Sequence, residues 1–154
     1  MTPALPDRRV VQADARRLAD WLRLRAALWP DCPADDHRAD ISRQLTQTGR
    51  YAAFLALDAG NAVALLEIAL RNDYVNGARS GSPVAFIEGL YVAPRHRRAG
   101  LTTMMLAAAK AWALTRGCSE MASDTSLDNL AAQAAHRALG FEESERVVFY
   151  RMAL

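Results

Sequence analysis

Three arginines and a histidine crowd into "RHRRAGLTT", between an apolar stretch that ends at Val92 and an apolar helical stretch that begins near Ala99. The N–H groups of the first helical turn have no intrahelical partner, and the helix dipole adds partial positive charge there. Gly100 allows a ligand to approach the backbone closely. These features are typical of a phosphate site, although neither a GK[ST] Walker A ending nor a GxGxxG fingerprint is present. The alternative is a solvated charge run that caps a helix.

Two carboxylates stand where a substrate could use them. Glu88 interrupts the otherwise apolar "VAFIEGLYV", where a carboxylate is costly to bury unless it serves a partner. Asp124 closes the extended segment "CSEMASD", and α/β sheets bind ligands at the carboxyl ends of their strands. Each residue also has a structural interpretation: a rim carboxylate paired with an arginine for Glu88, and a turn or helix cap for Asp124.

Composition limits the class of protein. The 154 residues are 51% apolar and 23% charged, which predicts one domain over residues 1–154 with a sizeable core. A net charge of +2 is too mild for a nucleic-acid binder. No apolar run is long enough to span a membrane, and the first residues lack a signal-peptide pattern, so we expect a cytoplasmic protein. Cys32 and Cys118 are too few for a disulfide framework or a cysteine-based zinc site, and we expect no metal.

The periodicity of apolar residues predicts a mixed α/β domain, a central sheet covered by helices. The acidic stretches "DCPADDHRAD" and "GFEESE" lie apart from the basic turn, so an anionic and a cationic ligand could bind at different places. Ser126 or Asp128 is available to cap the last helix. The expected strands are residues 8–13, 51–58, 61–71, 84–92, 118–124 and 146–153, and the expected helices are residues 13–29, 33–48, 100–117 and 126–140.

The segment "RRAGLT" resembles the Q/R-x-x-G-x-G/A signature of the GNAT acetyltransferases, which cradles the pyrophosphate of acetyl-CoA. Thr102 departs from the usual small residue at the final position. The later "DN…HRALGF" is similar to the family's "N…Y-x-x-LGF", and the order of elements also matches. From about Leu22 to Arg151 the resemblance narrows to the aminoglycoside 6′-N-acetyltransferases, through "LWP", "DYVNG", "FIEGLYV", "GCSEMASDTS" and "ALGFEESERVVFYR".

The resemblance implies a GNAT fold: a central, mixed, mostly antiparallel sheet flanked by helices, with a V-shaped opening for acetyl-CoA. The opening would lie between the strand that ends at Val92 and the strand that begins at Cys118. The residues implied in acetyl-CoA binding are Leu90, Tyr91, Val92, Arg97, Arg98, Ala99, Gly100, Leu101, Thr102, Thr103, Asn129 and His136. Asn129 could equally serve the first turn of its helix.

The implied reaction transfers the acetyl group of acetyl-CoA to the 6′-amino group of aminoglycoside antibiotics and so confers resistance. Glu88 and Asp124 are the candidates to accept the ammonium proton. His136 stands where many GNAT enzymes have a tyrosine near the CoA sulfur, so it would act on the departing thiolate; alternatively it only packs within its helix. The residues implied in substrate binding are Trp29, Tyr74, Glu88, Asp124 and Glu145. The family often uses the C-terminal strand at a dimer interface, which implies a homodimer.

Two other functions stay open. The chain could be a GNAT enzyme acting on another amine, such as a peptide N-terminus or a polyamine, or a CoA-binding module without turnover. The sequence does not identify the preferred aminoglycosides, the order of binding or the residue that takes the proton.

Overall fold

The computed structural model describes residues 7–73, 75, 77–81 and 83–154. Its strands are β1 (Arg8–Gln12), β2 (Tyr51–Asp58), β3 (Asn61–Arg71), β4 (Val84–Val92) and β5 (Met121–Ala122). Its helices are α1 (Leu18–Leu28), α2 (Ala34–Thr46), α3 (Leu101–Leu114) and α4 (Leu130–Ala138), with short 3₁₀ turns η1 (Ala15–Arg17) and η2 (Pro94–His96). Among these residues, no helix is long and apolar enough to cross a membrane.

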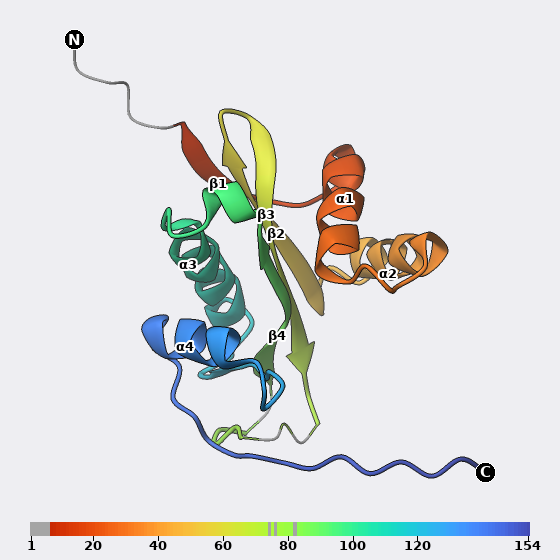
Figure 1. The fold of residues 1–154 in the computed structure, drawn as a ribbon, viewed down its shortest axis with the longest axis vertical. Helices are drawn as coiled ribbons and strands as arrows, with labels where there is room; N and C mark the ends of the chain where they lie inside the picture. The colour runs from red at the N-terminus through yellow and green to blue at the C-terminus, as the bar shows by residue number, and fades with distance from the viewer. Residues whose placement is uncertain (1–6, 74, 76, 82) are drawn as a thin grey trace.

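The strands form one sheet in the order β1-β2-β3-β4-β5. The first four pair antiparallel, and β4 pairs with β5 in parallel. Helices α1 and α2 lie on one side of the sheet, with α3 and α4 on the other (Figure 1). Because successive side chains of a strand point to opposite faces, Leu65 of β3 packs in the α1/α2 core while Leu66 packs in the α3 core. The predicted fold class, a mixed and mostly antiparallel sheet covered by helices, is confirmed.

The sheet splits open along β4. This strand pairs with β5 only at Ala85–Met121 and Phe86–Ala122, and then runs on to Val92 without a parallel neighbour in the described part of the chain. The register between β3 and β4 shifts after Ile87, so that Glu88 is the extra residue of a bulge. The predicted V-shaped opening therefore corresponds to the divergence of β4 and β5 beyond this bulge.

The predicted C-terminal strand over residues 146–153 is wrong for the single chain. Residues 141–154 form neither helix nor strand, and they run away from the body of the molecule (Figure 1). Val148, Phe149 and Tyr150 are 75%, 82% and 93% exposed. A strand forms only where a neighbour accepts its backbone hydrogen bonds, and the described part of this chain offers none to these residues.

Two helix starts also differ from prediction. The helix predicted over residues 13–29 is divided, because η1 precedes α1, and Leu18 remains 36% exposed. The last helix begins at Leu130, where the Oδ1 atom of Asn129 accepts a hydrogen bond from the N–H of Ala132 at 3.0 Å. The cap is therefore Asn129, as the alternative role of this residue predicted, and not Ser126 or Asp128. An asparagine at this position satisfies one of the unpaired N–H groups of the first turn.

Candidate active site

The basic turn between β4 and α3 presents unpaired N–H groups. Arg98 and Gly100 both have left-handed backbone conformations, with φ of 59° and 77°. Of the N–H groups from residue 98 to residue 103, none donates to an acceptor among the residues that the structure describes. Such a row of amides at the N-terminus of a 14-residue helix is suited to bind a phosphate or pyrophosphate.

Side chains of the turn itself and of β1 and β2 hold it in place. Arg97 Nε donates to the carbonyl of Val92 at 3.1 Å, and Arg8 Nη1 donates to the carbonyl of Ala99 at 3.3 Å. Asp58, at the end of β2, accepts from Arg8 Nε at 3.2 Å and lies 3.2 Å from His96 Nδ1. The turn is thus tied to β1 and β2, a set of contacts that the sequence analysis did not predict.

The edge of β4 that faces away from β3 offers further backbone hydrogen-bonding groups next to the turn. Along an antiparallel strand, every second residue directs its N–H and C=O away from its partner strand. In the stretch 87–92 these outward groups face the opening, because β5 has diverged. Leu90 and Val92 pack against the α3 core, and Tyr91 packs on the opposite face. An extended chain with amide groups, such as pantetheine, fits the place of a missing strand here.

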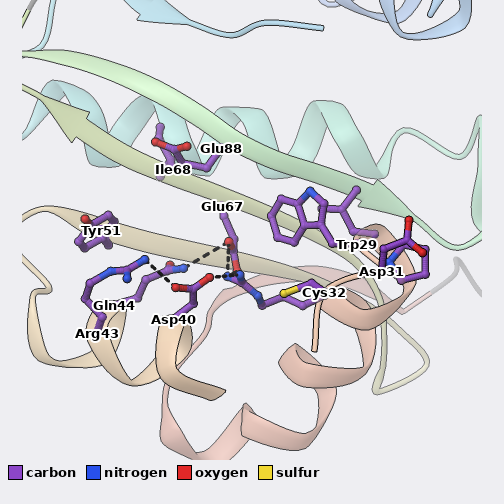
Figure 2. A pocket seen from close by; sticks show the side chains of 13 residues that line it. Trp29, Asp31, Cys32, Asp40, Arg43, Gln44, Tyr51, Glu67, Ile68 and Glu88 are labelled. Carbon is purple, nitrogen blue, oxygen red and sulfur yellow. Dashed lines mark hydrogen bonds and ion pairs between the residues drawn. The ribbon is translucent and has the colours of Figure 1, made fainter. Parts of the chain in front are cut away.

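A first pocket, the Trp29 pocket, lies between α1, α2 and the sheet and has a volume of about 820 Å³. Figure 2 shows Glu67 close to Asp40 and Gln44, Trp29 to one side of them, and Glu88 farther away, next to Ile68. The ring of Trp29 rests directly on Gly89, where a Cβ atom would lie only 2.6 Å from it. The residues that line the Trp29 pocket are Arg25, Leu28, Trp29, Pro30, Asp31, Cys32, Asp40, Arg43, Gln44, Tyr51, Glu67, Ile68 and Glu88.

A second pocket, the Asp124 pocket, has a volume of about 1040 Å³. It lies beyond the end of β5, between the connection that follows β3 and the C-terminal tail. Asp124, His136 and Glu145 line it, together with Arg71 and Glu120. Both pockets are of a size usual for sites that bind small molecules.

The two pockets meet at one ion pair. Arg71 lines the Asp124 pocket, and Glu88 lines the Trp29 pocket. Arg71 Nη2 donates to both carboxylate oxygens of Glu88, at 3.1 Å each. The guanidinium also lies 3.5 Å from the centroid of the Phe86 ring. The two charged side chains are 40% and 36% exposed, so the pair contributes at most about 1 kcal/mol to stability. Glu88 is therefore a rim carboxylate paired with an arginine, and its charge is accessible to a ligand.

Both ring nitrogens of His136 are engaged. Nδ1 lies 2.7 Å from the carbonyl of Ala132, so this nitrogen carries the proton and donates it. In the neutral ring Nε2 then accepts from the hydroxyl of Ser123, 2.9 Å away. Phe141 meets the ring edge-on, with the centroids 5.4 Å apart. Ser123 and His136 thus lie side by side in the lining of the Asp124 pocket, a contact that the sequence analysis missed.

The predicted site residues lie in the two pockets, in the basic turn, along the edge of β4 and at the start of α4. Trp29 and Glu88 line the first pocket; Asp124, His136 and Glu145 line the second. The predicted CoA residues occupy the turn and the free edge of β4, and Asn129 caps α4. Tyr74 lies outside the described residues. Arg71 and the buried Glu67 were not predicted, although Glu67 interrupts an apolar strand just as Glu88 does.

The match to known proteins agrees with this geometry. Residues 16–141 match the model of the acetyltransferase (GNAT) family. The chain belongs to this family. It is 51% identical to an aminoglycoside N(6')-acetyltransferase type 1 of Serratia marcescens, over 94% of this chain and 99% of that protein.

Solved structures of the family extend the match to the fold. A structure of AAC(6')-Iy in complex with CoA superposes with a TM-score of 0.94 at 42% identity and covers 100% of both chains. A second structure of AAC(6')-Iy holds the bisubstrate analogue CoA-S-monomethyl-acetylneamine. It has a TM-score of 0.91 and 43% identity, covering 96% of this chain and 99% of that one. The GNAT fold that the sequence predicted is therefore confirmed.

Proposed function

We propose that this GNAT enzyme transfers the acetyl group of acetyl-CoA to the 6′-amino group of aminoglycosides and thereby confers resistance to them. The observation that carries the proposal is the divergence of β4 from β5 beside Glu88. On one side of the opening lies the row of free amides that suits a pyrophosphate; on the other lie pockets rich in carboxylates. The relatives named above bear the same activity in their names.

The carboxylates suit a polycationic substrate. Asp31, Asp40, Glu67 and Glu88 line the Trp29 pocket and outnumber its arginines, Arg25 and Arg43. In the Asp124 pocket the carboxylates are balanced by basic side chains: Glu120, Asp124, Glu142, Glu143 and Glu145 lie with Arg71, Arg79, Lys110, Arg137 and Arg146. The excess of negative charge in the Trp29 pocket raises the local concentration of a cation, and salt screens the attraction. We infer that Trp29, Tyr74, Glu88, Asp124 and Glu145 contact the aminoglycoside.

The chemistry requires a neutral amine next to the thioester. An ammonium group that enters the pocket would replace the Arg71 guanidinium on Glu88, and Glu88 or Asp124 would accept its proton. The amine nitrogen then bonds to the thioester carbon and loses its second proton, the carbon–sulfur bond breaks, and the departing thiolate takes up a proton, so that the products are the amide and the CoA thiol. The N–H groups of the Leu90–Val92 edge would meet the developing negative charge on the carbonyl oxygen, an effect usually worth a few kcal/mol.

The regiochemistry is tested with matched substrates. Thiol release should be fast with a 6′-amino aminoglycoside such as kanamycin, whereas an aminoglycoside with a 6′-hydroxyl group should bind as a competitive inhibitor and release no thiol. Equal turnover of both would contradict transfer to the 6′-amine. Turnover of spermidine or a peptide, with none of any aminoglycoside, would favour the alternative GNAT reaction, and no turnover of any amine would favour a CoA-binding module.

We further infer a cytoplasmic homodimer of single-domain chains. The apolar side chains of the C-terminal tail and of Leu127 and Leu130, which are 65% and 70% exposed, form an unusually large apolar surface for a monomer. A second copy is the partner that fits, because its tail would supply the neighbouring strand that each tail lacks, in a closed and symmetric contact.

A further inference from the structure

Buried charge lies beneath the Trp29 pocket. Glu67 of β3 is 2% exposed and Arg25 of α1 is 4% exposed. Arg25 Nη1 donates to both carboxylate oxygens of Glu67, at 2.9 and 2.8 Å. Trp21 and Gln44 donate to the same carboxylate. Desolvation offsets much of the attraction within such a pair. The residues that the pair holds in place therefore matter more than its own contribution to stability.

The network reaches the backbone of Trp29 through a histidine. Arg25 Nε donates to His37 Nδ1 at 3.3 Å. Since arginine only donates, Nδ1 must be the unprotonated nitrogen, and the proton of the neutral ring is on Nε2. Nε2 then donates to the carbonyl of Trp29 at 3.2 Å. Hydrogen bonds therefore run from β3 through α1 and α2 to the residue that directly follows α1.

Two contacts hold the indole ring itself. The Arg25 guanidinium lies 4.8 Å from the ring centroid, within the range of a cation–π interaction. The second contact is with Gly89 of β4, where a Cβ atom would lie 2.6 Å from the edge of the ring. Trp29 is thus fixed by its carbonyl, by a buried cation and by the strand that carries Glu88.

We propose that His37 is a positioning residue, which orients the Trp29 ring for the aminoglycoside through its hydrogen bond to the Trp29 carbonyl. The inference rests on the proposed function, since Trp29 is one of the proposed substrate contacts. His37 is 2% exposed and lies outside both pockets, so it acts through Trp29 rather than on the substrate.

Steady-state kinetics of two variants test the role. His37→Leu removes both hydrogen bonds and should raise the KM for kanamycin about five- to tenfold, the usual scale for one buried hydrogen bond, while the KM for acetyl-CoA changes less than twofold. His37→Gln keeps an N–H donor near the position of Nε2 and should recover most of the loss. It also serves as the folded variant should His37→Leu fail to fold. An unchanged kanamycin KM, or equal rises in both KM values, would overturn the proposal.

A double-mutant cycle separates an effect through Trp29 from a general one. In a Trp29→Ala background, His37→Leu should raise the kanamycin KM no further, because the ring that it positions is gone. The same fold-increase in both backgrounds would show that His37 does not act through Trp29.

A substrate-free measurement keeps this inference distinct from the proposed function. The chain has three tryptophans, so protein labelled with 5-fluorotryptophan gives three ¹⁹F resonances, and Trp29→Phe identifies the one from residue 29. His37→Leu should shift that resonance. Leu45→Ala is the control, because Leu45 lies on the same helix and packs in the α1/α2 core but lines neither pocket, and it should leave the resonance in place. A wild type that acetylates no aminoglycoside would refute the proposed function alone; an unmoved Trp29 resonance in His37→Leu would refute the positioning role.

Discussion

At the scale of single residues, the hydrogen bonds of His136 limit what it can do. Its Nδ1 proton is committed to the carbonyl of Ala132, and its Nε2 accepts from Ser123. A neutral imidazole in this tautomer has no proton to give on the side of the pocket. A contribution to thiolate departure would pass through the Ser123 hydroxyl, which makes His136 a supporting residue.

We therefore expect His136→Ala to lower kcat about tenfold or less, which is typical of a supporting contact rather than of an obligatory acid. Ser123→Ala should have a similar effect, and the double variant should lose little more than either single variant. Pre-steady-state and steady-state thiol release would measure these changes. A loss of several hundredfold in His136→Ala would assign it the acid role.

At the scale of elements, the start of α3 depends on the backbone of Gly100. A side chain at this position would meet no atom within 4 Å, but φ is +77°, a conformation that β-branched residues rarely adopt. The effect of a substitution is thus a change of backbone geometry, which redirects the N–H groups of the turn.

We expect Gly100→Val to raise the KM for acetyl-CoA roughly tenfold or more, since several amide hydrogen bonds of about 1 kcal/mol each are misaligned. Gly60→Val is the matched control: Gly60 also has a positive φ, of 82°, and open space around it, but it lies in the β2–β3 turn. Both variants should lose similar thermal stability, and only Gly100→Val should change the acetyl-CoA KM. An unchanged KM in folded Gly100→Val would contradict the assignment of the turn.

The connection between β3 and β4 depends on Glu120, which precedes β5. Its carboxylate accepts from the N–H of Arg79 at 3.0 Å and from the N–H of Ser80 at 2.7 Å. These hydrogen bonds hold the pKa of Glu120 below its ordinary value of 4.5, and the bond from the Arg79 N–H has the largest effect. The carboxylate therefore stabilises the connection fully above pH 4.5, and this stabilisation is lost as pH falls through the lower pKa of the folded state.

We expect wild type to be more stable than Glu120→Gln at pH 7, by about 1–2 °C in Tm for a chain of this size. The difference should shrink as pH is lowered below 4.5. The lowered pKa values of Asp14 and Glu143 affect both proteins alike and cancel. Thermal unfolding followed by circular dichroism would measure the difference, and a Tm gap that does not depend on pH would contradict the proposed bonds.

At the scale of the whole molecule, the C-terminal tail (residues 141–154) stays exposed and forms no regular secondary structure in the single chain. Its apolar side chains are exposed, and α4 beside it buries none of its residues completely. Exposed apolar strands tend to pair with further chains. In a homodimer the tail would gain a neighbouring strand and cover this surface.

We expect light scattering to find a dimer for the wild type and a monomer for the double variant Val148→Asp, Tyr150→Asp. Charges on an apolar interface must be desolvated without partners, which prevents association. Arg9→Asp, with Arg9 on the distant strand β1, is the control for added negative charge and should remain dimeric. A monomeric wild type at micromolar concentration would refute the proposed dimer.

The sequence by itself determined most of the local elements and the position of the basic turn. The strand over residues 84–92 ends where the apolar pattern predicts, and Gly100 lies at the turn that needs a left-handed residue. Local hydrogen bonds and side-chain periodicity suffice for such features, because the residues that specify them are neighbours in the chain.

Only the tertiary structure decided the roles of residues that depend on distant partners. Glu67 and Glu88 both interrupt apolar strands, yet Glu67 is buried on Arg25 while the bulge of β4 leaves Glu88 at the surface with Arg71. The tail has a strand-like sequence but pairs with no strand among the residues that the structure describes, because a strand needs a partner that the pattern of its own side chains cannot specify. In each case the role of the residue depends on contacts with residues far apart in the chain. Local sequence patterns cannot predict the electrostatic and hydrogen-bonding energies of such contacts.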